Sequence, residues 1–497
     1  MHVKKSNRYC LDFLKLKIRR RKATVNLMMS LASCLEARSP TALSESPLYQ
    51  YEYGSISKAI ADLAHNSEER LQIQSLFRQF CFSLFATQSL SEGSRVILQT
   101  DTTSIIKAHS PTLPNRTHVP IPNNKIKGNK PIDIGYEASF INLSMPEGKW
   151  SLPLDVDRVR SDETASQRAL SQLEVLLSQS ELGLSNYLCL NNLDTKYGNA
   201  AYLASAFEHD NLVNLTRFRS GMKVWTKADG CNDRGAPQVF GEKYYLNFQS
   251  KYKTYKHPKT KSTYEVYQRS IFELPTDDYV MTEGQTKSGR KINIHIWRWK
   301  DLLIRSKNGN NMKDKPFDLM AVQIKDAQTD KVIFKRPMFI ALNGKRKNEI
   351  QSKEGYQTYR KRYDIEPFMR FSKQHLMLDK LQTPDIEHLD NWLLLNQPVM
   401  WLLWSAAKEA TFQPKKWRQY LPENKDTENQ SILSPTQTRR AAEKLFLTFD
   451  LTPFKPQKSK KGRPRQKGEK QSQRTRYNVV KKTTAKTKIK LKSEKIE

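Results

Sequence analysis

The sequence predicts a mixed α/β protein, and three observations support that fold class. Short apolar runs rich in β-branched residues alternate with helical patterns between residues 91 and 220. Residues 221–350 show strand-like alternation, as in KINIHIWRW at 291–299. Residues 355–380 place their chemical groups at helical spacing. We therefore expect an α/β core interrupted by a β-rich insertion, with a helical N-terminal region and a basic C-terminal tail that is disordered in isolation.

The predicted elements of the core follow one order. A strand at 95–100 ends at Asp101, and two further strands lie around 133–143 and 150–154. A helix at 164–179 precedes a strand at 187–193, which is followed by Asp194, a helix reaching residue 209 and a strand at 211–219. This order of strand, two strands, helix, strand, helix and strand is typical of the ribonuclease H-like fold, which should close with one more helix.

Composition suggests five segments. Residues 1–90 form a basic leader and short helices at 55–63 and 70–85, which we expect to contact DNA; ordinary helix packing is the alternative. Residues 91–220 and 351–412 form the two parts of the core, and 221–350 form the insertion. Residues 413–497 form the basic, mostly disordered tail. Residues before Met28 are expected to be a dispensable extension.

The net charge of +33 points to a polyanionic partner. Residues 455–497 alone carry 17 lysine and arginine residues against three glutamates. Within them, KKGRPRQKG at 460–468 resembles an AT-hook, which implies that Arg463 and Arg465 enter the minor groove of A·T-rich DNA. A basic enzyme or a ribosome-associated protein is the alternative interpretation of the charge.

Cysteine usage and hydropathy limit the compartment. The five cysteines are scattered and include no C-x-x-C pair, which argues against a disulfide framework or a zinc site. No apolar run approaches 18 residues, so we expect no membrane-spanning helix.

Residues 355–380 carry the strongest functional signal. Tyr359, Arg362, Glu366 and Lys373 stand at offsets that fall within about 60° of one another on a helix of roughly 100° per residue. A phenol, a guanidinium, a carboxylate and an ammonium would therefore share one face. The structural alternative is an Arg362–Glu366 ion pair on an exposed helix, which would stabilise it by a few tenths of a kcal/mol.

The spacing Tyr-x2-Arg-x3-Glu-x6-Lys resembles the signature around the third catalytic acid of one group of bacterial DDE insertion-sequence transposases. The neighbouring words RYDIEPFMRFSKQ and LDKLQTPDIEHLDNW, the DTTS sequence at Asp101, and Asp194 followed by Tyr-Gly-Asn are also similar to that group. The resemblance covers about residues 28–412, and a β-rich insertion is typical of the group at this point. One departure is Pro367, which removes a helix hydrogen bond after Glu366. The other is the sequence Asp-Thr-Lys-Tyr at 194–197, where many relatives have arginine after the aspartate.

The resemblance implies a catalytic and metal-binding triad of Asp101, Asp194 and Glu366. From the residues alone, Asp133 and Asp155 compete with Asp101 for the first position. Two Mg²⁺ ions are expected, with Mn²⁺ able to substitute, because phosphodiester chemistry by this route needs clustered carboxylates. Tyr359, Arg362 and Lys373 are implied to hold the terminal nucleotides of the element.

The expected function is therefore that of a DNA transposase, an Mg-dependent endonuclease and strand transferase that cuts insertion-sequence ends and joins them to target DNA. Its partners would be double-stranded DNA with terminal inverted repeats, target DNA and a second copy in a synaptic homodimer, in the bacterial cytoplasm at the nucleoid. The alternatives are a catalytically silent DNA-binding protein derived from a transposase and a general ribonuclease H-like nuclease.

Three further features add expectations. Lysine and tyrosine alternate through 243–267, where aromatic rings could stack on bases while charges meet phosphates; a solvated strand face is the alternative. Trp225, Trp297 and Trp299 fit buried packing better than base contact. Thr383, Pro384 and Asp385 predict a helix start, and Pro398 predicts an interruption of the apolar helix that follows.

Overall fold

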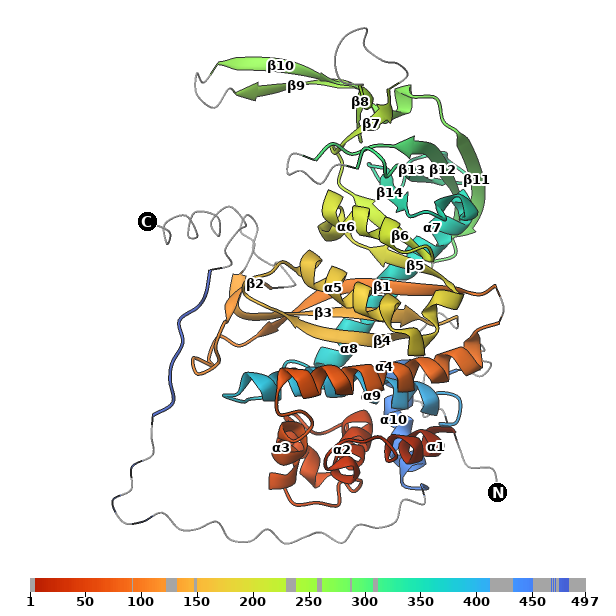
Figure 1. Ribbon diagram of the computed structural model, residues 1–497. Helices are drawn as coiled ribbons and strands as arrows, with labels where there is room; N and C mark the ends of the chain where they lie inside the picture. The colour runs from red at the N-terminus through yellow and green to blue at the C-terminus, as the bar shows by residue number, and fades with distance from the viewer. Residues whose placement is uncertain are drawn as a thin grey trace. The chain divides into compact units, whose positions relative to one another are not determined.

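The computed structural model describes residues 5–91, 93–121, 132–146, 150–228, 238–256, 262–286, 288–306, 312–411 and 432–449, with 466, 468, 470 and 473–481 (Figure 1). These residues form a mixed α/β protein with a large mixed sheet. The chain divides into two compact units. Unit 1 comprises Met1–Leu90, Asp101–Leu173 and Asp364–Glu497, and unit 2 comprises Ser91–Thr100 and Glu174–Tyr363.

Unit 1 is built around the apolar helix α9 (Ile386–Ala406), in which every residue from Leu389 to Ala406 is buried. Five helices and one strand contact it: α1 (Lys5–Phe13), α2 (Arg21–Ser33), α3 (Gly54–Ala61), α4 (Ser67–Ser89), α10 (Pro435–Phe446) and β4 (Ser151–Val159). A helix that is apolar on all sides must be covered on all sides, which explains this arrangement. The helix begins at Ile386, with Asp385 as its cap, and continues through Pro398. The predicted start at Thr383 and the predicted interruption are therefore wrong.

The N-terminal segment is part of this core. Tyr9, Cys10 and Phe13 of α1 are buried, and the Tyr9 hydroxyl donates to the Pro398 carbonyl oxygen at 2.8 Å. Every residue of α2 from Ala23 to Ser33 is also buried. The expectation that residues before Met28 are dispensable is therefore wrong for the described residues, because their apolar side chains cover α9.

Part of the C-terminal region is also folded. Helix α10 begins with a capping box between Ser434 and Gln437 and packs on α2 and α9. Farther along, the Tyr477 amide donates to the Pro111 carbonyl and the Val480 amide to the Arg116 carbonyl, each at 2.8 Å. The expected disorder of residues 413–497 is thus wrong for these segments, since α10 buries an apolar face that composition alone underrated.

The strands of unit 1 form an antiparallel arrangement. β3 (Ile132–Ser144) pairs with β2 (Thr117–Pro120) and with β4, and the last residues of β1 (Arg95–Ile106) lie beside β3. Helix α4 crosses β4, where Arg78 pairs with the buried Asp155 at 2.7 Å. Helix α5 (Ala165–Ser178) follows β4 and runs from unit 1 into unit 2.

Unit 2 contains the mixed part of the sheet. Its strand order is β11 (Asp278–Gln285), β12 (Lys291–Leu302), β13 (Phe317–Asp326), β14 (Met338–Asn343), β6 (Leu212–Phe218), β5 (Leu188–Leu193) and the first residues of β1. β1, β5 and β6 are parallel, and the remaining pairs are antiparallel. Strands predicted within the insertion therefore continue the sheet of the core.

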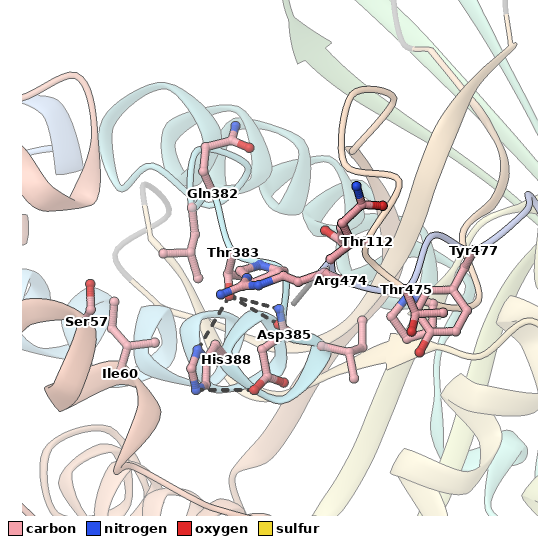
Figure 2. Close-up of a pocket in the computed structure, with 15 residues that line it drawn as sticks. Ser57, Ile60, Thr112, Gln382, Thr383, Asp385, His388, Arg474, Thr475 and Tyr477 are labelled. Carbon is pink, nitrogen blue, oxygen red and sulfur yellow. Dashed lines mark hydrogen bonds and ion pairs between the residues drawn. The ribbon is translucent and has the colours of Figure 1, made fainter. Parts of the chain in front are cut away.

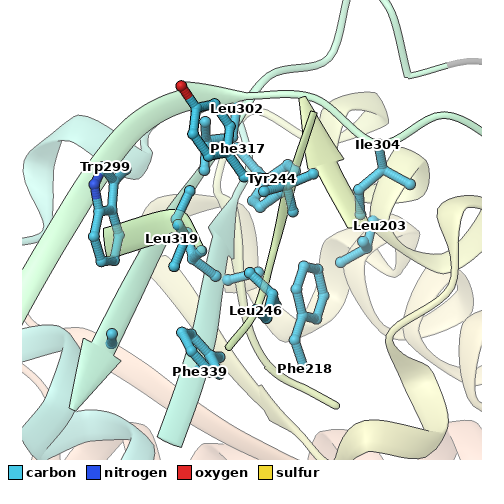
Figure 3. Close-up of a cluster of buried hydrophobic side chains, with 14 of the residues drawn as sticks. Leu203, Phe218, Tyr244, Leu246, Trp299, Leu302, Ile304, Phe317, Leu319 and Phe339 are labelled. Atoms are coloured by element: carbon cyan, nitrogen blue, oxygen red, sulfur yellow. The ribbon is translucent and has the colours of Figure 1, made fainter. Parts of the chain in front are cut away.

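The two faces of this sheet bury separate cores. Ile292, Ile294 and Ile296 belong to one cluster, which also contains Tyr356 and Tyr359 of α7 (Ser352–Arg360). Trp299 belongs to the other cluster with Phe218, Phe317 and Phe339, and Trp297 packs against it (Figure 3). The alternation predicted for residues 291–299 is confirmed, as is the packing role of these two tryptophans.

The remaining elements of unit 2 are small. β7 (Lys223–Lys227) pairs with β8 (Phe240–Tyr245), and β9 (Lys251–Lys256) pairs with β10 (Thr263–Gln268), each as a separate two-stranded sheet. Helix α6 is short (Ala200–Ser205). The 3₁₀ helices of the chain include η1 (Pro40–Glu45), η2 (Ser180–Leu182), η3 (Leu184–Asn186), η4 (Thr195–Tyr197), η5 (Ala206–Glu208), η6 (Ile271–Glu273), η7 (Lys347–Glu349) and η8 (Lys361–Asp364).

The single helix predicted over residues 355–380 is divided. α7 ends at Arg360, η8 spans Lys361–Asp364, and α8 spans Ile365–His375. Pro367 lies in the first turn of α8, where its missing N–H costs nothing, whereas a continuous helix would place it in the interior. The common face expected for the four signature residues is therefore interrupted between Arg362 and Glu366.

Candidate active site

The two aspartates predicted from the core strands follow paired positions. β1 and β5 are parallel, and Thr100 is the register partner of Leu193. These are the last paired residues of the two strands, and both belong to unit 2. Asp101 is the residue after the first of them, and Asp194 is the residue after the second.

Asp194 is half-buried and stands at the N-terminus of η4. Its main-chain carbonyl accepts from the Tyr197 amide at 3.0 Å, but its carboxylate makes no capping hydrogen bond to that helix. An aspartate after a strand often serves as a helix cap. Here the carboxylate is not used in that way, which removes the simplest structural explanation for it.

Asp101 is half-buried and lies within β1, which continues to Ile106. The prediction that the strand ends at Asp101 is therefore wrong. One of its carboxylate oxygens accepts from the Thr102 amide at 2.8 Å. The side chain thus projects from a strand interior.

Two side-chain amides connect these strands to the signature segment inside unit 2. Gln99 and Asn192 are register partners one residue before Thr100 and Leu193. The Asn192 amide donates to the Thr358 carbonyl at 2.9 Å, and the Gln99 amide donates to the Lys361 carbonyl. The Thr358 carbonyl also accepts from the Lys361 main-chain amide, so the Asn192 amide is a second donor that ties the end of α7 to β5. Sequence reasoning missed both residues; their only signal was polarity within apolar strands.

Tyr359 is fully buried at the end of α7. Its hydroxyl donates to the Leu193 carbonyl at 3.5 Å, next to Asp194. Burial raises the pKa of Tyr359 strongly; the nearby Arg362 opposes this and the Asp194 carboxylate adds to it. Tyr359 therefore supports the end of β5 in this structure, and its hydroxyl does not face solvent.

Arg362 lies in η8 and is only 4% exposed. Its Cζ atom is 4.4 Å from the centre of the Tyr363 ring, within the range of a cation–π contact. The positive charge of Arg362 lowers the pKa of Tyr359, and the negative charge of Asp194 raises it. Both charges are therefore close enough to the Tyr359 hydroxyl to affect its ionisation. Arginine keeps its charge when buried, so Arg362 supplies a permanent positive charge in this part of unit 2.

Glu366 and Lys373 lie on α8 in unit 1. Glu366 is exposed in the first turn, where a carboxylate is stabilised by the helix dipole. The Lys373 ammonium donates to the Ser104 carbonyl of β1 at 2.6 Å, and burial lowers its pKa while Asp379 partly opposes the shift. Ser104 lies three residues after Asp101 on the same strand. The last turn of α8 is therefore attached to the strand that carries Asp101.

The competing aspartates have structural partners. Asp155 is fully buried and accepts from Arg78 and, at 2.9 Å, from the Gln172 amide. Asp133 accepts from the amide of the next residue, Ile134, at 2.7 Å. A buried aspartate held by an arginine and an amide is a satisfied core group. Asp155 is thus explained without a ligand.

The carboxylates of Asp101, Asp194 and Glu366 are the ligand type that Mg²⁺ prefers. Across the described ranges, however, no three His, Cys, Asp or Glu side chains are grouped so that they could hold a metal ion. The donor chemistry fits magnesium. Asp101 and Glu366 belong to unit 1 and Asp194 to unit 2, so the grouping of the three carboxylates stays a prediction.

A separate cavity of about 730 Å³ lies in unit 1 at the start of α9 (Figure 2). Asp385 caps α9 and lies 3.5 Å from the His388 ring, whose other nitrogen is 3.5 Å from the Thr383 hydroxyl. Arg474 and Tyr477 of the C-terminal segment also line it. None of the signature residues contributes, so this cavity is distinct from the predicted site.

Arg463 and Arg465 of the AT-hook-like sequence lie outside the described residues. Among the helices that are described, none is long and apolar enough to cross a membrane. No protein-family model and no curated protein sequence matches the chain.

Proposed function

We propose that the protein is a DDE-type DNA transposase with a ribonuclease H-like core, which cuts the ends of an insertion sequence and joins them to target DNA. The observation that carries the proposal is the attachment of the signature segment to the strands β1 and β5. The paired amides of Gln99 and Asn192 hold the end of α7 and the start of η8, and these two residues stand two positions before Asp101 and Asp194.

The order of elements supports the ribonuclease H-like assignment. β1 is followed by the antiparallel strands β3 and β4, then by α5, β5, α6 and β6, with β5 and β6 parallel to β1. In such sheets, residues at the carboxyl ends of neighbouring parallel strands lie at one edge, which is where ligands bind. Asp194 follows the carboxyl end of β5, and Asp101 follows the last residue of β1 that pairs with β5, within a strand that continues to Ile106.

In the proposed site, Asp101, Asp194 and Glu366 hold two Mg²⁺ ions, or Mn²⁺ in their place. Magnesium bound there supplies Lewis-acid stabilisation for phosphodiester hydrolysis and strand transfer. Arg362 contributes permanent positive charge beside Asp194, and Lys373 contributes positive charge on α8. Both are proposed to bind phosphates of the terminal nucleotides. Tyr359 positions the end of β5, because its buried hydroxyl bonds to the main chain.

The partners that follow from the proposal are duplex DNA with terminal inverted repeats, target DNA and a second copy in a synaptic dimer at the bacterial nucleoid. The net charge of +33 favours a polyanionic partner in each alternative as well. Charge therefore does not distinguish the three functions, but DNA cleavage does. A silent DNA-binding derivative would cut no DNA, and a general nuclease of this fold would cut DNA without terminal repeats.

The test is cleavage of DNA that carries the inverted repeats flanking the gene, with and without Mg²⁺. Wild-type protein should release the ends only with the metal, and Glu366→Gln should reduce release to background while its affinity for the same DNA stays unchanged. Glu68→Gln is the matched control, because Glu68 is also an exposed acid at the second position of a helix, α4.

Each other outcome favours a different function. Release of ends by Glu366→Gln at the wild-type rate would remove Glu366 from the chemistry and overturn the proposal. Tight binding by wild-type protein without any cutting would indicate the silent DNA-binding derivative. Equal cutting of DNA without repeats would indicate the general nuclease.

A further inference from the structure

The two-stranded ribbon formed by β9 and β10 in unit 2 is exposed on both faces. Nine of its twelve residues are exposed, and the exposed fractions of Tyr252, Tyr264 and Tyr267 are 69%, 48% and 48%. A ribbon that covers no core is marginally stable on its own. Its side chains therefore face a partner or solvent and do not serve internal packing.

The ribbon is firmly attached at its base. The Asn247 amide donates to the Gln268 side chain at 3.1 Å, and the Ser270 hydroxyl donates to the Asn247 carbonyl at 2.6 Å. The Tyr245 amide donates to the Arg269 carbonyl at 2.8 Å. These bonds tie the end of β10 and the two residues after it to β8 and to the loop between β8 and β9, so the base of the ribbon is held in place.

The tyrosines pack against one another across the strands. Tyr252 is the register partner of Tyr267, with ring centres 5.1 Å apart, and Tyr255 is the partner of Tyr264 at 5.9 Å, with rings stacked at 23°. Direct partners lie on one face, so each face carries one aromatic pair. Ring surface used in these pairs is unavailable to nucleobases, which argues against the base stacking expected from the sequence.

The charge of the ribbon is strongly one-sided. It carries Lys251, Lys253 and Lys256 against the single acid Glu265. Lys251 and Lys253 share the face of Tyr255, because alternate residues of a strand point the same way, and that face carries no acid among its described residues. None of the three lysines forms an ion pair with a described acidic side chain. The acids at the base, Glu242 and Glu273, are paired with Arg269.

We propose that the β9–β10 ribbon lies in the major groove of duplex DNA. The major groove is about 12 Å wide and admits a two-stranded ribbon, whose strands lie about 4.8 Å apart, whereas the minor groove is only about 6 Å wide. Six residues extend about 20 Å, enough to follow the groove past several phosphates. Lysine ammonium groups and tyrosine hydroxyls are the groups that contact those phosphates.

The same geometry selects DNA over duplex RNA. The major groove of A-form RNA is deep and narrow, so a ribbon with side chains on both faces does not enter it. This inference deepens the proposed function, because it names an arm by which the protein holds duplex DNA away from the cut. It can nevertheless be tested without any cleavage.

The first test is the salt dependence of binding to a fluorescein-labelled, mixed-sequence duplex three helical turns long, in EDTA. The variant carries Lys251→Gln, Lys253→Gln and Lys256→Gln. The plot of log K against log salt concentration has a negative slope, and its magnitude should decrease by about 2–3 in this variant. Each lost phosphate contact reduces that magnitude by about 0.9. The matched control removes the same charge from exposed positions elsewhere in unit 2, with Lys227→Gln, Lys291→Gln and Lys300→Gln. An equal slope for the two variants would overturn the proposal.

The second test identifies the groove by dimethyl sulfate footprinting, which reports guanine N7 in the major groove and adenine N3 in the minor groove. Wild-type protein should protect guanine N7, and the ribbon variant should lose that protection. Protection confined to adenine N3, protection that survives in the ribbon variant, or tighter ribbon-dependent binding to the single strand would each contradict a major-groove arm.

The two proposals fail separately. If wild-type protein cuts repeat-bearing DNA while the ribbon variant keeps its footprint and salt slope, only the ribbon proposal fails. If the footprint depends on the ribbon while no magnesium-dependent cutting occurs, only the transposase proposal fails. Circular dichroism of the variants confirms that the exposed substitutions leave the fold unchanged.

Discussion

Gln99 and Asn192 face each other across the parallel strands β1 and β5, and both donate their side-chain amides to carbonyls of the segment that carries Tyr359 and Arg362. A pair of strand residues thus fixes the end of a helix more than 160 residues away in the sequence. The strands cannot shift in register without breaking the two bonds. The register of β1 and β5 is therefore coupled to the position of the segment that carries Tyr359 and Arg362.

Asn192→Leu tests this coupling. The change keeps the size of the side chain but removes one of the two hydrogen bonds to the buried Thr358 carbonyl, which keeps its bond from the Lys361 amide. The free energy of unfolding should therefore fall by about 0.5–1.5 kcal/mol. DNA cleavage should fall more than DNA affinity, because Tyr359 and Arg362 lose their support. Urea denaturation and cleavage assays measure both effects. Asn348→Leu, at an exposed position of unit 2, should change neither; equal effects of the two variants would contradict the coupling.

Asp318→Ala tests the buried ion network at the edge of unit 2. Asp318 is fully buried and binds Arg298 at 2.6 Å and Lys347 at 2.5 Å. Removing it leaves the buried Arg298 without an acid and leaves Lys347 with the exposed Asp301 alone, which should cost about 3–5 kcal/mol of stability. Asp210→Ala, in an exposed pair with Lys345, should leave the urea midpoint nearly unchanged. An equal loss of stability in both variants would show that the buried ion network contributes no more than an exposed ion pair.

Lys107 should make the stability of unit 1 depend on alkaline pH. Burial lowers its pKa to about 8, and its amine donates to the carbonyls of Asp379 and Leu381. Since the unfolded pKa is about 10.4, the unfolded chain holds a proton that the folded chain has lost between these values. The free energy of unfolding should therefore rise with pH over that window. Urea titrations across it should show the rise in wild-type protein and in Lys444→Met, an exposed control, and its loss in Lys107→Met.

Arg116 should control the docking of the C-terminal segment. Its guanidinium donates to the Tyr477 carbonyl at 3.0 Å and to the Lys107 and Ala108 carbonyls at 3.2 Å. Arg116→Ala should speed hydrogen exchange at the Tyr477 and Val480 amides, which are bonded to Pro111 and Arg116. Lys481→Ala should leave those rates unchanged. Unchanged exchange in Arg116→Ala would show that the main-chain bonds alone hold the segment.

The strands were predictable because their signal is local. Residues 187–193 and 211–219 are short runs that contain several large apolar residues, and the observed β5 and β6 lie within them. The alternation of isoleucine and tryptophan in β12 likewise reports two buried faces. Such patterns depend on neighbouring residues only, so the sequence is sufficient to find them.

The errors arose where a distant partner decides the structure. The apolar face of α1 packs against α9, and nothing in the sequence near α1 identifies that distant partner. Gln99 and Asn192 are polar residues in apolar strands, and nothing local identifies the carbonyls they bind. Pro367 was recognised as a disturbance, but whether it lies inside a helix or begins a new one depends on how η8 packs. The grouping of the three acids stays a prediction.

The covering of α9 by helices from both ends of the sequence has a consequence for biosynthesis. Residues 5–33 emerge from the ribosome long before residues 386–406, at about 5–20 residues per second. For some tens of seconds the apolar sides of α1 and α2 lack the helix they cover, so the nascent chain is expected to need a chaperone during that interval.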